Sequence, residues 1–140
     1  MLAEVRSGLT SYDCRGTWAL SGGPTALWAE GYLGDDAGPN AISLEADDML
    51  SCSDVDNALG GEVGVARLGM PCAPGGKANC QQTARSMHGA AGVNTCFVDG
   101  SIRFISDYID VGIDGTPPNL GTWDKLILSA DGQPINKNNF

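Results

Sequence analysis

The stretch Val93–Ile105, VNTCFVDGSIRFI, decides the fold of this chain, because it contains two short strands around a turn. The Asp99-Gly100 pair predicts a two-residue hairpin loop, since a type I′ turn needs positive φ at both central positions. The strand pairs expected across it are Val98 with Ser101, Phe97 with Ile102, and Thr95 with Phe104. One face, expected in the core, holds Val93, Thr95, Phe97, Ile102 and Phe104. The outer face holds Asn94, Cys96, Val98, Arg103 and Ile105.

Around this hairpin, the chain predicts a β-rich α+β fold, with an antiparallel sheet, long loops and a short C-terminal helix. Its 140 residues correspond to a single domain over residues 1–140, and its 20 Gly and 7 Pro favour short strands joined by turns. The opening MLAEVRSGL alternates as a strand does, and Thr17–Leu20 predicts another. A last short strand is expected after ADGQPI.

Two further segments complete the expected architecture. Gly31–Gly61 has little periodicity and predicts a long structured loop, and one helical turn is expected near Gln81–Ser86. The segment TWDKLILSA predicts the C-terminal helix, with Thr122 as N-cap. Its apolar face is expected to contain Trp123, Leu126 and Ile127.

Charge is concentrated in one part of the chain. The net charge is −9, and residues 16–66 contain nine acids and no Lys or Arg. Nucleic-acid binding is therefore not expected, because phosphate neutralisation needs a basic face. Calcium takes oxygen ligands, so a calcium site is predicted from Asp35, Asp36, Asn40, Asp47 and Asp48. No EF-hand pattern is present. Another acidic group, ranked below the first, comprises Asp107, Asp110 and Asp114.

The five cysteines indicate an exported protein with one or two disulfides and an odd thiol. Cys72 is expected to pair with Cys80, closing a small loop, or with Cys52. A zinc site is not expected, because the chain has no CxxC motif and a single histidine. No stretch approaches the roughly 20 apolar residues of a membrane helix, so no membrane contact by this fragment is predicted.

His88, the only histidine, is a candidate general base or metal ligand. The alternative is a histidine satisfied by backbone hydrogen bonds, and Asp99 is then a turn residue. No GxSxG motif supports a serine nucleophile. Whether the chain is an enzyme stays open. If it is, His88 or a carboxylate would activate water while calcium polarises an ester or lactone carbonyl, for example of an acyl-homoserine lactone. Carbohydrate binding is a third hypothesis, through Trp18, Trp28 or Trp123.

Residues 86–105, SMHGAAGVNTCFVDGSIRFI, resemble the C-terminal motif of the prepilin-type processing-associated His-x9-Asp-Gly family, which is related to type IV pilins and type II secretion pseudopilins. His88 matches the motif histidine and Asp99-Gly100 the terminal pair, although ten residues separate them here. EVRSGL, RGTWAL, LWAEGY and the TWDKL ending are also similar to the family.

The resemblance implies a pseudopilin-like globular head without the N-terminal helix. It implies a non-enzymatic, exported structural or assembly domain, extracellular or periplasmic, whose partners are other pilin-like subunits or secretion machinery. SADGQP, residues 129–134, is similar to the calcium-loop region of major pseudopilins, which implies Asp131 as a further calcium ligand. The expected function is therefore a calcium-stabilised, pseudopilin-like domain, with the calcium-dependent hydrolase as the alternative.

Overall fold

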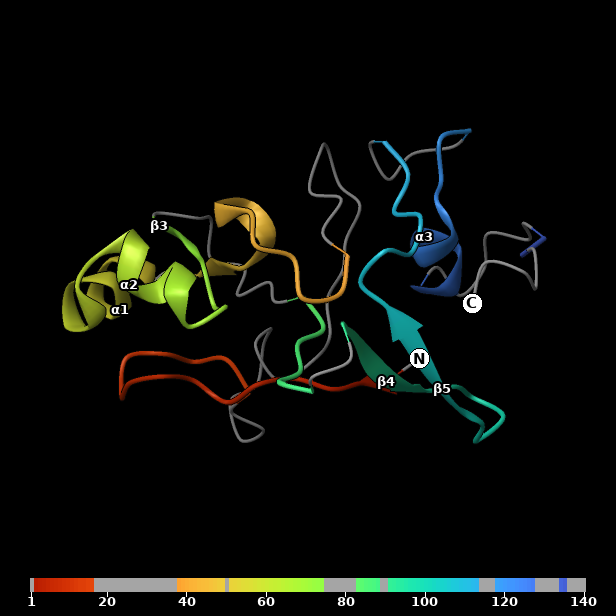
Figure 1. Ribbon diagram of the computed structural model, residues 1–140, viewed down its shortest axis with the longest axis horizontal. Helices are drawn as coiled ribbons and strands as arrows, with labels where there is room; N and C mark the ends of the chain where they lie inside the picture. The colour runs from red at the N-terminus through yellow and green to blue at the C-terminus, as the bar shows by residue number, and fades with distance from the viewer. Residues whose placement is uncertain are drawn as a thin grey trace.

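A computed structural model describes residues 2–16, 38–49, 51–74, 83–88, 91–113, 118–127 and 134–135. These residues form short helices and short strands, which confirms the predicted α+β class. In chain order they are β1 (Leu2–Ala3), the 3₁₀ turn η1 (Leu44–Ala46), β2 (Asp48–Met49), α1 (Cys52–Leu59), α2 (Glu62–Arg67), β3 (Ala73–Pro74), β4 (Gly92–Cys96), β5 (Ile102–Ser106) and α3 (Thr122–Ile127). Helices α1 and α2 lie at one end of the molecule, and the β4–β5 hairpin and α3 lie at the other (Figure 1).

The larger sheet has the order β1-β4-β5 and is antiparallel throughout, as predicted. The opening strand expected over residues 1–9 is confirmed only at Leu2–Ala3, which form β1, and Ala3 pairs with Thr95 of β4; residues 4–8 are irregular. A second, parallel pair joins β2 to β3 near the helices. The sheet therefore brings the start of the chain beside the hairpin that lies 90 residues later.

The predicted two-residue hairpin loop is wrong. The N–H of Gly100 donates to the carbonyl of Phe97, and the N–H of Phe97 donates to the carbonyl of Ser101, each at 2.9 Å. Gly100 alone in this turn has a positive φ, of 80°. This is the three-residue loop in which a type I turn is followed by a left-handed residue. The longer loop shifts β5 by one residue against β4.

The one-residue shift reverses the faces of β5. Ile105 pairs with Val93 and is fully buried, whereas Phe104 pairs with Asn94 and is 45% exposed. Ile102, also expected in the core, is 73% exposed. The predicted core positions Val93 and Thr95 are confirmed, because both are buried, and Phe97 is only partly buried.

The predicted loop over Gly31–Gly61 is also wrong in its last part, because it contains α1. Cys52, Val55 and Asp56 recur at helical spacing and face inward, and Gly60 ends the helix with a left-handed φ of 86°. The helical turn expected near Gln81–Ser86 does not form over its described residues, since residues 83–88 are irregular. Instead, the Arg85 N–H donates to the carbonyl of Glu4, which ties this segment to β1.

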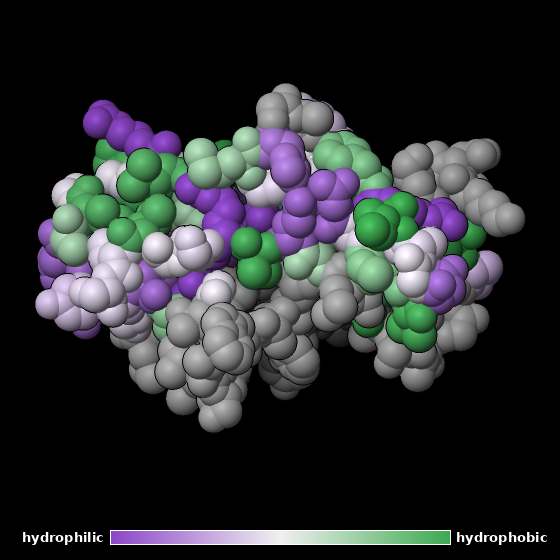
Figure 2. All heavy atoms as spheres, turned by 90° about the horizontal axis from the view of Figure 1, so that it is seen from below, coloured by the Kyte–Doolittle hydropathy of each residue, from purple (hydrophilic) through white to green (hydrophobic). Residues whose placement is uncertain are grey.

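Two hydrophobic clusters stabilise the two ends. One contains Met49, Cys52, Val55, Val65, Met70 and Cys72, and the other contains Ala84, Val93, Ile105, Ile109 and Trp123. On the face seen in Figure 2, apolar side chains gather toward both ends, with hydrophilic side chains between them.

The C-terminal helix is confirmed as α3, and Leu126 and Ile127 pack against the second cluster beside Trp123. The cap differs by one residue, because Thr122 is the first helical residue and the Asp124 carboxylate accepts the N–H of Gly121. Trp123 is 2% exposed, so it is a core residue and not a carbohydrate platform. Trp18 and Trp28, the strand expected at Thr17–Leu20 and nearly all of the closing strand fall outside the described residues.

Candidate functional site

A polar cluster joins three segments on the outer face of the larger sheet. Glu4 follows β1, Asn94 lies in β4, and His88 ends the irregular segment 83–88. The Nε2 atom of His88 lies 2.7 Å from Oε1 of Glu4. The backbone N–H of Asn94 donates to Oε2 of Glu4 at 2.8 Å, and its side-chain amide donates to Oε1 at 3.1 Å. Glu4 is therefore the centre of the cluster.

These contacts favour the ionised form of Glu4. Partial burial acts to raise the pKa of Glu4, but the hydrogen bonds from Asn94 and His88 outweigh it and lower the pKa below 4.5. The side chains of His88 and Glu4 are 49% and 32% exposed. A carboxylate that orients an accessible imidazole is an arrangement used in general-base catalysis, and it also serves as a structural clamp.

A shallow depression of about 230 Å³ lies beside this cluster. Its lining combines apolar and polar side chains: Ala3, Glu4, Asn94, Thr95, Cys96 and Ile102. Cys96 supplies a partly buried thiol that is not in a disulfide. The depression is smaller than the roughly 300–1,000 Å³ typical of small-molecule sites.

Asp99, which the sequence comparison paired with His88, has a different role from His88. Its carboxylate accepts the N–H of Ser101 at 2.9 Å, and the hydrogen bonds from Ser101 lower its pKa below 3.8. His88 binds Glu4 instead. Asp99 thus stabilises the turn, and His88 separately stabilises the contact between β1 and the segment before β4.

Asp47, a predicted calcium ligand, lies in a buried ion-pair network. Its Oδ2 accepts from Nη1 of Arg15 at 2.7 Å and from Nε of Arg85 at 2.9 Å. Its Oδ1 accepts the N–H of Thr83 at 2.9 Å. The carboxylate has no exposed surface. Both of its oxygens are therefore engaged by the protein's own donors.

Asp13 completes the network on the other side of Arg15. It accepts two hydrogen bonds from that guanidinium, at 2.9 and 2.7 Å. Burial acts to raise the pKa of Asp13, but its hydrogen bonds with Arg15 and Leu9 and the charge of Arg15 lower it below 3.8. Arg15 also donates to the carbonyls of Met70 and Pro71. Four buried charges of balanced sign thereby join the N-terminal loop to segments far along the chain.

The other predicted calcium ligands are placed only in part. The side-chain oxygen of Asn40 accepts the N–H of Ser86, and its amide donates to Asp107 at 2.8 Å. Asp48 belongs to β2, but its side chain is outside the described atoms. Asp35, Asp36 and Asp131 lie outside the described residues. Calcium binding by this set stays a prediction.

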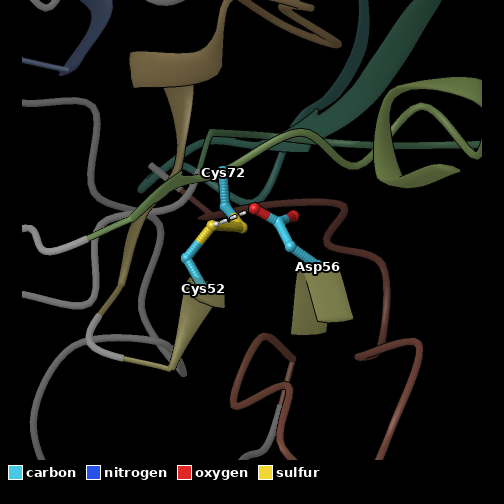
Figure 3. Close-up of side chains that lie close together, drawn as sticks. All are labelled: Cys52, Asp56 and Cys72. Carbon is cyan, nitrogen blue, oxygen red and sulfur yellow. Dashed lines mark hydrogen bonds between the residues drawn. A yellow bond between two sulfur atoms is a disulfide. The ribbon is translucent and has the colours of Figure 1, made fainter. Parts of the chain in front are cut away.

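A disulfide joins Cys52, at the start of α1, to Cys72, so Cys72 pairs with the second of its two expected partners. Asp56, one helical turn after Cys52, points toward the sulfur atoms (Figure 3). Its Oδ2 lies 3.8 Å from Sγ of Cys52. Burial raises the pKa of Asp56 above 3.8, and the charge of Glu62 adds to this effect.

Sequence reasoning found His88 but missed its partners and the buried network. The alternation of β4 placed Asn94 on the outer face, and that signal could have identified it as a neighbour of His88. Glu4 had no comparable signal, because its contact with His88 spans 84 positions. Asp56 could have been found from its i+4 spacing to Cys52 once a helix was assigned.

Comparison with known proteins places the chain in a family without assigning it a function. No curated protein and no solved structure matches it. None of the helices in the described ranges has the length and apolar character of a membrane span. The family model described as "Protein of unknown function (DUF1559)" matches residues 1–112. The chain, of whose 140 residues this match covers 112, therefore belongs to that family.

Proposed function

We propose that the chain is an exported, pseudopilin-like structural domain that assembles with other pilin-like subunits or with secretion machinery. The observation that carries this proposal is that His88 and Asp99, the two residues that match the family motif, both make contacts within the fold. His88 binds Glu4 and so joins the segment before β4 to β1, and Asp99 stabilises the hairpin loop. These contacts within the chain give both residues a structural role that requires no substrate.

The exposed apolar side chains of β5 support contact with a partner. Ile102 and Phe104 are 73% and 45% exposed on the outer face of the sheet. In the described part of the chain, β5 is an edge strand. Edge strands that carry apolar side chains pair readily with other chains, and contiguous apolar patches mark interaction sites. This face is therefore the surface we assign to assembly.

The disulfide and the acidic segment bear on location and stability. A disulfide is weak support for an extracellular or periplasmic location, where thiols are oxidised. Calcium is proposed to order the acidic segment through Asp35, Asp36, Asn40 and Asp48, with Asp131. The melting temperature is then expected to rise with calcium and to fall with a chelator. A melting temperature that responds to neither would refute calcium binding.

Sedimentation velocity over a range of protein concentrations tests assembly. Wild-type protein is expected to form larger species as concentration rises, and Phe104→Asp is expected to remain monomeric. Tyr12→Asp is the matched control, because Tyr12 is 58% exposed but lies in the N-terminal loop. Its self-association should equal that of wild type.

Two outcomes would contradict the assembly surface. One is a wild-type protein that stays monomeric at all concentrations and also when mixed with a pilin-like subunit. The other is loss of association by Tyr12→Asp to the same extent as by Phe104→Asp.

The calcium-dependent hydrolase is retained as a second candidate because of one geometric observation. The imidazole of His88 lies 2.7 Å from a carboxylate oxygen of Glu4, which itself lines the depression. Such a pair has the components needed to activate water toward an ester or lactone carbonyl. Hydrolysis of short-chain esters and acyl-homoserine lactones by wild type and His88→Ala, with and without calcium, distinguishes the candidates. Activity that neither change affects would exclude this mechanism.

A further inference from the structure

We infer that Cys52, Cys72 and Asp56 form a binding site for a thiophilic divalent cation, such as Zn²⁺, when the disulfide is reduced. Twenty positions separate the two cysteines, and no metal-binding spacing connects them in the sequence. The fold nevertheless places the two sulfur atoms and a carboxylate oxygen within 4.8 Å of one another. Figure 3 shows these side chains converging from α1 and from the segment before β3.

The ligand chemistry matches zinc. Zinc in proteins is held by thiolates at about 2.3 Å and by carboxylate oxygens at about 2.1 Å, usually in tetrahedral geometry. Ligands of one such ion therefore lie about 3.3–3.8 Å apart. The Sγ of Cys52 and Oδ2 of Asp56 are already 3.8 Å apart. The two sulfurs must also separate to bind one ion, which reduction of their bond permits.

The state of Asp56 is the second, independent observation. The residue is 9% exposed, and its Oδ1 has no hydrogen-bond partner among the described residues. A buried carboxylate oxygen without a partner costs free energy. A cation bound at Oδ2, the oxygen nearer the sulfurs, would offset the charge of this buried carboxylate, and bidentate binding would also engage Oδ1.

The local electrostatics favour a thiolate at Cys52. Cys52 is the first residue of α1, where the partial positive charge of the helix N-terminus stabilises a thiolate. The charge of Arg15 also acts on Asp56, in the direction that favours its ionised form.

The redox step requires a two-electron reductant, a dithiol in the cell or a phosphine in the assay. Two electrons from the reductant and two protons break the sulfur–sulfur bond and give two thiols, and metal binding then releases both thiol protons. Cys52 and Cys72 are fully buried, so reduction is expected to require local opening of the α1–α2 region. The disulfide and the metal-bound form are thus alternative ways to hold α1 against Cys72.

Cobalt titration of the phosphine-reduced full chain tests this site, because Co²⁺ reports thiolate ligation by its absorption. Wild type is expected to bind one Co²⁺ with thiolate charge-transfer and tetrahedral bands, and zinc is expected to displace it. Asp56→Asn should weaken binding at least about tenfold. Asp54→Asn, on the exposed side of the same helix, should leave it unchanged.

Further arms identify which thiols bind the metal. Cys52→Ser should abolish the bands, and Cys96→Ser should retain them. If the reduced chain unfolds without metal, circular dichroism should show that Zn²⁺ restores its helix content. The inference is overturned if reduced wild type gives no thiolate bands, if Asp56→Asn binds as tightly as wild type, or if metal binds without restoring the fold.

Discussion

Replacing Asp47 with Asn is expected to be among the most damaging single changes in the described part of the chain. The side chains of Arg15 and Arg85 are 1% and 2% exposed, and both donate to Oδ2 of Asp47. An amide has almost the same shape but no charge. The substitution therefore leaves two buried guanidinium groups with Asp13 as the remaining carboxylate of the network.

The expected magnitude follows from the cost of breaking a buried ion pair, which is about 3–5 kcal/mol. A domain of this size has a free energy of unfolding of about 5–15 kcal/mol. The loss is therefore a large fraction of the total. At roughly 3–4 °C per kcal/mol, the melting temperature should fall by about 10–20 °C.

Urea denaturation followed by circular dichroism measures this loss, with Asp54→Asn as the control. Asp54 is exposed in the first turn of α1, so its substitution should cost no more than about 1 kcal/mol. An Asp47→Asn variant within 1 kcal/mol of wild type would refute the idea that this network holds the fold together.

Four further changes test other parts of the structure. Ile105→Ala should lower the free energy of unfolding by about 2–5 kcal/mol and Ile102→Ala by less than about 0.5 kcal/mol, because only Ile105 is buried. The reverse order would indicate the register of a two-residue hairpin loop. His88→Ala should lower stability by no more than about 1 kcal/mol, and a double-mutant cycle with its carboxylate partner should show coupling; independent effects would argue against the clamp. Because the pKa of Asp13 is lowered, its contribution to folding stability is present above pH 3.8 and is lost as the pH falls through the native pKa. Asp13→Asn should therefore make the free energy of unfolding fall less steeply at acid pH. An unchanged acid dependence would contradict this. Because the pKa of Asp56 is raised, its contribution to folding stability is present below pH 3.8 and is lost as the pH rises through the native pKa. Asp56→Asn should therefore stabilise the oxidised protein at pH 7, by about 1 kcal/mol, but not at pH 3. Destabilisation at pH 7 would show that the carboxylate is satisfied.

The elements that could be predicted are those with local signals. The turn residues located the β4–β5 hairpin, and the spacing of Trp123, Leu126 and Ile127 located α3. The register could not be predicted, because an Asp-Gly pair is compatible with both two- and three-residue loops. As a result, Phe104 was predicted in the core and Ile105 on the surface, whereas Ile105 is buried and Phe104 is exposed.

The missed helix and the missed network have different causes. Helix α1 was missed because its acidic residues made the segment look like a polar loop. In the structure, Cys52 and Val55 face inward at helical spacing and Asp54 faces solvent. The cluster of neighbouring acids predicts Asp47 as a metal ligand, and its two arginine partners, 32 and 38 positions away, leave no local signal of the ion pair. Contacts over such distances depend on the whole topology, so the role of Asp47 could be determined only from the fold.

The central claim is that the outer face of the β1-β4-β5 sheet contacts other subunits. Cys96 reports on this face, because its thiol lines the depression beside Ile102 and is not in a disulfide. The direct measurement is the rate of maleimide labelling at Cys96, followed by peptide mass spectrometry at rising protein concentration and in the presence of a pilin-like subunit. The rate should fall as the domain assembles, and Phe104→Asp should abolish that protection. A labelling rate that stays constant while larger species form would contradict the assignment of this face to assembly.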